Sequence, residues 1–261
     1  MWIKRLRFSF MACALASVAT IAQAQEATES TPEEAISAAL KQIVGDAQLG
    51  PIRPSVVDGL YTVQVVGGPT LMVTPDGKYA VMGDTYEITP GGLAAVQDPY
   101  LQNARKEFLA NLEVTESINF APEEGAKHVA YVFTDVDCGY CRRLHSQLHE
   151  YRERGELKPG YNDLGIEIRY LAYPRAGANS PSAAKLESAW CADNQQEALD
   201  KLKSLQEVEP KSCEASPVAR QYVKGGELGV NATPAILLPD GRFFLGYLPP
   251  ERLLNTITEG E

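Results

Sequence analysis

The stretch FTDVDCGYCRRLH, from Phe133 to His145, places two cysteines close together in a chain that has five. It overlaps the end of an apolar run, HVAYVF, that is typical of a buried strand, and it continues with a helical pattern. Cys138 is therefore predicted to begin a helix, where unpaired backbone N–H groups and the helix dipole favour thiolate over thiol. Cys141 lies one turn further along, close enough to form a disulfide with it.

Three kinds of site are conceivable for this pair. A zinc site would need a second close pair, but Cys191 and Cys213 are 22 positions apart. A purely structural bridge between Cys138 and Cys141 would close a very short loop and stabilise little. The pattern favours a redox pair, with Cys138 as nucleophile and Cys141 as the thiol that resolves a mixed disulfide with substrate. No metal is expected.

The other candidate side chains are predicted to be structural. A bridge between Cys191 and Cys213 would contribute about 3 kcal/mol in the chain-entropy model and would hold a helical block together. A second redox pair is the alternative, although neither of these cysteines begins a helix. His145 and His149 are predicted to be surface residues.

The first 24 residues have the layout of a cleaved secretory signal peptide. Three basic residues precede a short apolar run that ends in AQA at residues 22–24. This run is shorter than the roughly 18 to 20 residues that span a bilayer. We therefore expect export, with residues 1–24 removed.

The charge of the mature chain excludes one class of partner. Without the signal peptide, 21 Lys and Arg stand against 34 Asp and Glu, a net charge of −13. Nucleic acid binding needs clustered basic residues, so nucleic acid is not expected as a partner. Export also means that the cysteines of the mature chain can form lasting disulfides, because the environment outside the cytoplasm is oxidising.

A small N-terminal unit is predicted from one helix and several short strands. Residues 31–34, TPEE, indicate a helix start, with Thr31 as N-cap and Glu34 closing a capping box. The apolar face that follows comprises Ile36, Leu40, Ile43 and Val44. The runs LYTVQVV, TLMVT, KYAVM and TYEI then predict an antiparallel meander. Because so small a unit buries little apolar surface, it is expected to pair with a second copy of itself.

A connecting helix and an α/β domain follow. Asp98-Pro99 indicates a helix start, and the apolar stripe of this helix comprises Leu101, Ala104, Phe108 and Leu112. Beyond the cysteine pair, the active-site helix is expected to carry Leu144, Leu148 and Tyr151 on one side. A strand over 165–173, a mostly helical stretch from about 180 to 228, a hairpin and a closing helix complete an α/β order with a helical insertion.

Thr233-Pro234 directly precedes the strand AILLP. A proline there is compatible with an ordinary edge strand. In a thioredoxin-like arrangement it would instead be a cis-proline beside the cysteine pair, leaving the Thr233 backbone free to pair with an extended substrate chain.

Taken together, these blocks resemble the DsbC-type periplasmic disulfide isomerases, with the DsbG-type proteins next. The matching segments are FTD-x-x-CGYC-x-x-LH, RYLAYPR at 169–175, AWCA around Cys191, Cys213, GV-x-x-TPA at 229–235, GYLPP and GKYAVMGDTYEI. The resemblance covers essentially the whole mature chain, and the order of the blocks is highly specific.

The resemblance implies an α+β fold made of three parts after the signal peptide. These are a small N-terminal α+β dimerisation domain (25–96), a linker helix (97–114) and a C-terminal thioredoxin-like α/β domain with a helical insertion (115–261). It also implies a homodimer with chaperone activity whose shared cleft holds misfolded exported proteins. A membrane-embedded reductase of the DsbD type would keep the pair reduced, and no cofactor is expected. Substrate would contact Gly139, Tyr140, Thr233 and Pro234.

Three departures from the family pattern stand out. Residues 153–163 look like an insertion. Asp137 adds a negative charge directly before Cys138 that would oppose thiolate formation. Thioredoxin has a buried acid six residues before its first cysteine, where this chain has Val132, so another group or water would have to relay the proton.

Other functions remain open at the level of sequence. A holdase would use the cleft and not the cysteines, and a DsbA-like oxidase would keep the pair oxidised. A DsbG-like protein would reduce sulfenic acids on folded proteins. Gly139 and Tyr140 favour the isomerase, because the DsbG-type dipeptide usually begins with proline.

Overall fold

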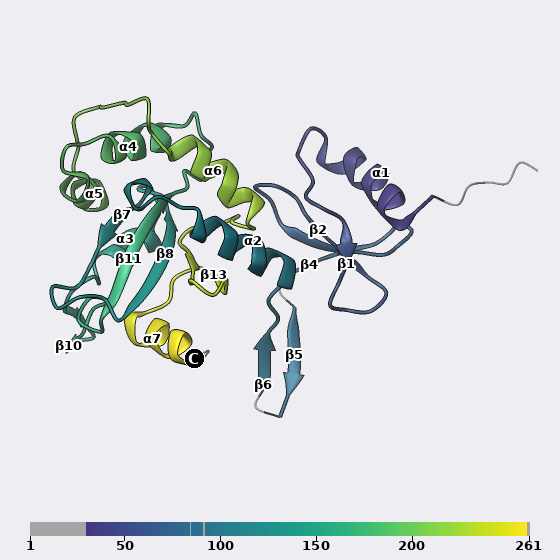
Figure 1. Cartoon of the computed structure of the whole chain (residues 1–261), viewed down its shortest axis with the longest axis horizontal. Helices are drawn as coiled ribbons and strands as arrows, with labels where there is room; N and C mark the ends of the chain where they lie inside the picture. Colours follow the sequence, from purple (N-terminus) through teal and green to yellow (C-terminus); the bar gives the residue numbers. More distant parts are fainter. Residues whose placement is uncertain (1–29, 84, 91, 260–261) are drawn as a thin grey trace, which may run out of the picture. The chain divides into compact units, whose positions relative to one another are not determined.

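The computed structural model describes residues 30–83, 85–90 and 92–259, and Figure 1 shows the chain. The predicted signal peptide, residues 1–24, lies outside the described residues. Within them, every helix is too short or too polar to cross a membrane.

The first helix, α1 (Pro32–Val44), begins as the sequence predicts. The Thr31 hydroxyl accepts a hydrogen bond from the Glu34 backbone N–H, and the Glu34 carboxylate accepts one from the Thr31 N–H. Ile36 and Leu40 are buried, whereas Ile43 is 80% exposed, so the predicted apolar face is wrong at Ile43. The packed residues Ile36, Leu40 and Val44 advance in steps of four, so their row turns by about 40° per step, and in the last turn Ile43 lies about 100° from Val44, outside that row.

The strands after α1 form a four-stranded antiparallel sheet in the order β1-β2-β3-β4. They are β1 (Arg53–Pro54), β2 (Tyr61–Gln64), β3 (Thr70–Val73) and β4 (Ala80–Met82). The meander is thus confirmed for three of the predicted runs. The fourth run, TYEI, forms β5 (Tyr86–Thr89), which pairs with β6 (Gly92–Ala95) in a separate two-stranded sheet. The sequence missed β6 because its first residue is a glycine in what looks like a turn.

Helix α2 (Pro99–Ala110) is capped by the Asp98 carboxylate, which accepts from the N–H groups of Tyr100 and Leu101. Its apolar stripe packs against the central sheet of the following domain, and the Phe108 and Phe133 rings stack with centroids 6.3 Å apart. The predicted connector is therefore also a covering layer for that sheet. A short 3₁₀ helix, η1 (Val114–Glu116), follows.

The central sheet has the order β13-β12-β8-β11-β7. Its strands are β7 (Ile118–Phe120), β8 (His128–Thr134), β11 (Ile166–Ala172), β12 (Ala235–Leu237) and β13 (Phe243–Leu245). Strands β8 and β11 are parallel and lie side by side in Figure 1, whereas β7, β12 and β13 pair antiparallel with their neighbours.

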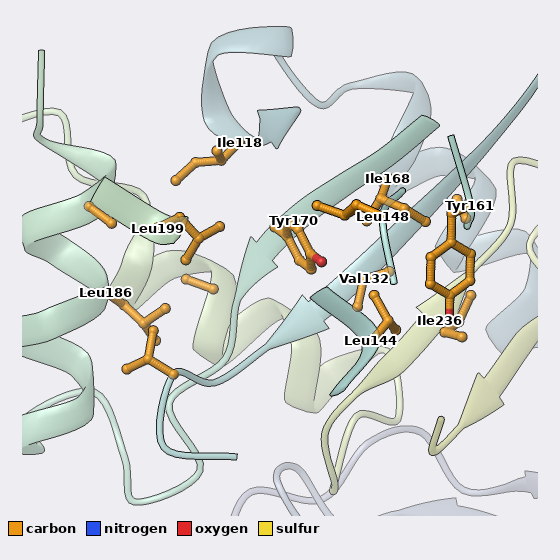
Figure 2. Packing of buried hydrophobic residues seen from close by; sticks show 14 of the residues in the cluster. Ile118, Val132, Leu144, Leu148, Tyr161, Ile168, Tyr170, Leu186, Leu199 and Ile236 are labelled. Atoms are coloured by element: carbon orange, nitrogen blue, oxygen red, sulfur yellow. The ribbon is translucent and has the colours of Figure 1, made fainter. Parts of the chain in front are cut away.

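Both faces of this sheet are buried, which explains the nearly continuous apolar runs of its central strands. Along β8, Ala130 and Val132 face one hydrophobic cluster, while Tyr131 and Phe133 face the other. Figure 2 shows the larger cluster, where Val132 meets Leu144 from the active-site helix. Five further helices surround the sheet: α3 (Gly139–His145), α4 (Pro181–Trp190), α5 (Gln195–Lys203), α6 (Val218–Glu227) and α7 (Pro250–Thr258).

The segment after α3 differs from the prediction. The helix ends at His145, Leu148 is buried beyond its end, and Tyr151 begins a strand. This strand, β9 (Tyr151–Glu153), pairs with β10 (Glu156–Lys158) through the two-residue turn Arg154-Gly155. Both turn residues have positive φ, as a tight hairpin turn with the favoured twist requires. The predicted insertion at 153–163 thus contains most of a hairpin.

Candidate functional site

The cysteine pair lies where β8 passes into α3. Cys138 is the N-cap of the helix, and its Sγ accepts a hydrogen bond from the Cys141 backbone N–H at 3.2 Å. Both cysteines are free and buried. The thiols are thus close together at the end of a strand whose two faces are packed, so their position is fixed by the core.

The two thiols have opposite acidities. A hydrogen bond from the Cys141 side chain, aided by the positive charge of Arg175, lowers the pKa of Cys138 to about 5, although burial acts against this. Burial raises the pKa of Cys141, and its hydrogen bond to Cys138 raises it further. At neutral pH the reduced pair therefore holds one thiolate, on Cys138, and one thiol.

The stretch before β12 comes to the same place from far along the chain. Residues 138 and 233 are 95 positions apart, yet Cys138 Sγ lies 3.2 Å from the Thr233 carbonyl oxygen. The Thr233–Pro234 peptide bond is cis. Strand β12 then pairs with β8, with Ala235 opposite Phe133, so sheet register holds this peptide beside the cysteine pair.

Gly139 and Tyr140, between the two cysteines, form the exposed first turn of α3. The Tyr140 side chain is 63% exposed, and its ring stacks on that of Tyr247 with centroids 6.4 Å apart. A Cβ atom at Gly139 would meet only the end of the Arg142 side chain, 3.9 Å away. Both residues are open to an incoming molecule.

An ion pair that the sequence did not predict holds the turn between β8 and α3 in place. The buried Asp135 carboxylate accepts hydrogen bonds from the backbone N–H of Asp137 and from the backbone and side chain of Arg175. Arg175 follows β11, which runs parallel to β8, so the ends of both strands meet at one edge of the sheet. The parallel pairing of these two strands was therefore the feature that could have placed Arg175 near the cysteine pair.

Asp137, the residue expected to oppose the thiolate, has a partner of its own. Its carboxylate lies 2.8 Å from the Lys185 Nζ on α4, and both side chains are about half exposed. The Arg175 side chain also donates to the Asp137 carbonyl. The negative charge of Asp137 is thus offset locally.

Lys203 was also missed. It is buried, and its Nζ donates hydrogen bonds to the Thr134 hydroxyl and the Asp135 carbonyl. Burial lowers the pKa of Lys203 to about 8. A signal was present in the sequence, because Lys203 stands four residues after the buried Leu199 and so lies on the packed face of α5.

Comparison with known proteins agrees with this geometry. Residues 97–261 match the family described as a thioredoxin-like domain, and residues 22–95 match the disulfide bond isomerase protein N-terminal domain. The thiol:disulfide interchange protein DsbC of Escherichia coli (strain K12) is 36% identical over 208 residues, 80% of this chain and 80% of that protein. The chain belongs to the DsbC family.

One further relative supports that assignment to the DsbC family, and one solved structure is similar over part of the chain. DsbC of Dickeya dadantii (strain 3937) is 35% identical over 219 residues, 83% of this chain and 84% of that protein. The solved disulfide interchange protein from Neisseria gonorrhoeae aligns with 57% of this chain and 97% of its own at 25% identity, with a TM-score of 0.46.

Membership of the DsbC family confirms the resemblance seen in the sequence and the α+β fold class, with a DsbC-type N-terminal domain before a thioredoxin-like one. The chain is an enzyme of thiol–disulfide exchange. The DsbG-like alternative is not favoured, because the relatives are DsbC proteins.

The two histidines that follow the cysteine pair differ in burial. The prediction for His145 was wrong: its side chain is 9% exposed, and its ring nitrogens contact the Tyr170 hydroxyl at 3.1 Å and the Asp200 carboxylate at 2.8 Å. Burial lowers the pKa of His145. His149 is exposed, as predicted.

Cys191 and Cys213 form a disulfide with an S–S distance of 1.99 Å. It joins the end of α4 to the loop before α6, within the helical block of the thioredoxin-like domain. The residues that the structure describes contain no group of three His, Cys, Asp or Glu side chains placed to hold a metal ion.

Proposed function

We propose that this chain is a periplasmic disulfide isomerase and reductase in which Cys138 attacks incorrect disulfides and Cys141 resolves the resulting intermediate. The observation that carries this proposal is the asymmetry of the reduced pair. Cys138 has a pKa lowered to about 5 and is ionised at neutral pH, whereas burial keeps Cys141 protonated. A reduced pair with one stable thiolate is suited to attacking disulfides.

The chemistry requires no bound cofactor. The Cys138 thiolate forms a bond to one sulfur of the substrate disulfide, and the other substrate sulfur leaves with the electron pair as a thiolate. When the freed thiolate attacks a neighbouring substrate disulfide, it forms a new bond there and releases a different substrate thiolate. When a different thiolate attacks the substrate sulfur of the mixed disulfide, a new substrate disulfide forms, Cys138 leaves as thiolate, and the substrate is isomerised. When Cys141 attacks Cys138 instead, the substrate leaves reduced and the enzyme becomes oxidised.

Gly139, Tyr140, Thr233 and Pro234 are proposed to contact the substrate. The exposure of Tyr140 and the closeness of the Thr233 carbonyl to Cys138 support this. A substrate main chain that runs past Thr233 and Pro234 would form hydrogen bonds with the backbone of this segment, as an added strand does.

The proposed assembly is a homodimer through an N-terminal domain of residues 25–96, joined by a linker helix (97–114) to the catalytic domain (115–261). Large apolar side chains stand exposed on the small N-terminal sheets, which favours a partner there. They are Tyr79, Val81, Met82, Tyr86, Ile88 and Leu93. Chaperone activity is proposed to use the space between the two catalytic sites of the dimer. A DsbD-type membrane reductase is proposed as the electron donor that keeps the cysteine pair reduced. Residues 1–24 are proposed as the signal peptide for export.

Refolding of scrambled ribonuclease tests the catalytic proposal. The reduced wild-type protein should restore ribonuclease activity, Cys138→Ala should not, and His149→Ala, an exposed control beyond the same helix, should behave as wild type. Equal rescue by wild type and Cys138→Ala would overturn the proposal. A monomer in sedimentation at micromolar concentration would remove the dimer, and loss of aggregation suppression in Cys138→Ala would argue against a separate chaperone activity.

Thiol trapping in cells separates the isomerase from an oxidase. The pair of an isomerase or reductase is expected to be mostly reduced, because a free Cys138 thiolate starts the reaction. A pair that is mostly oxidised in cells would favour the DsbA-like alternative.

A further inference from the structure

Lys203 is a buried charge beside the cysteine pair that the mechanism above does not use. It stands at the end of α5, within the helical insertion, and is 5% exposed. Its Nζ donates to the Thr134 hydroxyl, at the end of β8, and to the Asp135 carbonyl at 3.2 Å. Both acceptors are neutral oxygens, and none of the described carboxylates forms an ion pair with it. The carboxylate of Asp135 is held by Arg175.

A buried ammonium group with only neutral acceptors is costly unless another negative charge compensates it. The nearby groups able to provide one are the two cysteines and Asp135, and the Asp135 carboxylate is already paired with Arg175. The Asp135 carbonyl, which accepts from Lys203, also accepts a hydrogen bond from the Cys138 backbone N–H at 3.3 Å, and the Cys141 N–H donates to Cys138 Sγ. One residue of main chain therefore links the ammonium group to the segment that holds both sulfurs.

The two sulfurs exchange charge during the reaction. In the reduced enzyme the negative charge is on Cys138, and the Cys141 thiol donates a hydrogen bond to it, which raises the pKa of Cys141. Once Cys138 is joined to substrate it is neutral and that hydrogen bond to a thiolate is lost. Cys141 then becomes the one sulfur near Lys203 that can carry a negative charge.

We propose that Lys203 is a positioning residue that stabilises the Cys141 thiolate during resolution of the mixed disulfide; this rests on the proposed function. Cys141 gives up its proton to solvent, and its sulfur forms a bond to Cys138 Sγ. The bond between Cys138 and the substrate sulfur breaks, and the substrate leaves as a thiolate.

Several charged or titratable groups face Lys203 or the two sulfurs, so its effect must be separated from theirs. They are Cys138, Asp135 and Arg142 from the β8–α3 segment, Arg175 after β11, the Tyr170 ring, and the His145–Asp200 pair. Lys201, two residues before Lys203 on α5, instead forms an exposed ion pair with Glu197 at 2.7 Å. It provides a matched control for loss of a lysine from this helix.

The test follows the two steps separately in the full-length reduced protein mixed with glutathione disulfide. Acid quenching and mass spectrometry between pH 5 and 9 measure formation of the Cys138–glutathione adduct and then its decay by Cys141. In Lys203→Met we expect decay at pH 7 to slow about tenfold and its pH profile to move up by about one unit, since one pKa unit is a tenfold change in thiolate. Formation of the adduct should change less, and Lys201→Met should match wild type in both steps.

Decay with the wild-type pH profile in Lys203→Met would overturn the inference while leaving the proposed function standing. Failure of the wild-type protein to form the adduct at all would overturn the proposed function instead.

If Lys203→Met does not fold, as judged by near-ultraviolet circular dichroism, the wild type gives a second test. The titration of its buried lysine, followed by NMR of ε-carbon-labelled lysine, should move to lower pH when the pair is oxidised, because the thiolate is lost. An identical midpoint in both redox states would overturn the inference.

Discussion

The two cysteine pairs of this chain differ in their spacing and in their redox state. Cys138 and Cys141 are one helical turn apart, reduced and buried beside Arg175 and Lys203. Cys191 and Cys213 are 22 positions apart and joined by a disulfide. The contrast shows that spacing decides how much a bridge can stabilise the fold, whereas the surrounding charges decide whether a thiol can react.

The largest expected effect comes from removing the long-range bridge. Because the bridge restricts the unfolded chain, Cys191→Ser/Cys213→Ser should lower the free energy of unfolding by about 3 kcal/mol, while Cys138 keeps its reactivity. Urea denaturation with a parallel alkylation assay measures both. Cys138→Ser/Cys141→Ser is the matched control, and an equal loss of stability in that variant would break the comparison.

The next effect concerns the acidity of Cys138. With its pKa lowered to about 5 from the ordinary 9.0, Cys138 should be ~100-fold more ionised at pH 7 than an unperturbed thiol. Iodoacetamide alkylation across pH 4 to 9 should give a midpoint near 5. A midpoint above 8 would contradict the proposed nucleophile.

The lowered pKa of Cys138 also makes the stability of the reduced protein depend on pH. Because the folded pKa of Cys138 lies below the unfolded one, its stabilisation of the reduced protein is fully present above about pH 9 and is lost as pH falls through about 5. Between these values the reduced wild type should gain stability with pH relative to Cys138→Ala. An unchanging difference between the two proteins would contradict the assigned shift.

A smaller effect is expected from Arg175→Gln. The change removes a positive charge that lowers the pKa of Cys138 and leaves the buried Asp135 carboxylate without its ion-pair partner. Since Arg175 is about half exposed, solvent screens the pair, and we expect a loss of about 1 kcal/mol and a several-fold slower alkylation at pH 5. Wild-type alkylation at that pH would show that Arg175 does not act on the thiolate.

The smallest effect is expected from Asp137→Asn. Because Asp137 is exposed and already paired with Lys185 at 2.8 Å, removal of its charge should change the alkylation midpoint of Cys138 by less than about half a pH unit. Lys185→Gln tests the pairing from the other side. A large downward shift of the midpoint in Asp137→Asn would show that Asp137 does oppose the thiolate.

Local signals in the sequence predicted most elements and their starts. The capping box at Thr31, the cap at Asp98 and the start of α3 at Cys138 all depend on hydrogen bonds between residues two or three positions apart. Predictions failed where packing overrides local pattern. Ile43 keeps the apolar spacing but lies off the packed face, and Tyr151 leaves the helix for a hairpin whose turn is set by Arg154-Gly155.

The sequence by itself determined the identity of the cysteine pair, its place at a helix start and the family to which the chain belongs. Only the tertiary structure decided what surrounds the pair. Parallel pairing of β8 with β11 brings Arg175 to it, pairing of β12 with β8 brings Thr233, and packing of α5 brings Lys203. Caps and periodicity are written into neighbouring residues, whereas the charges that tune a thiol come from segments that meet only when the sheet and its helices have packed.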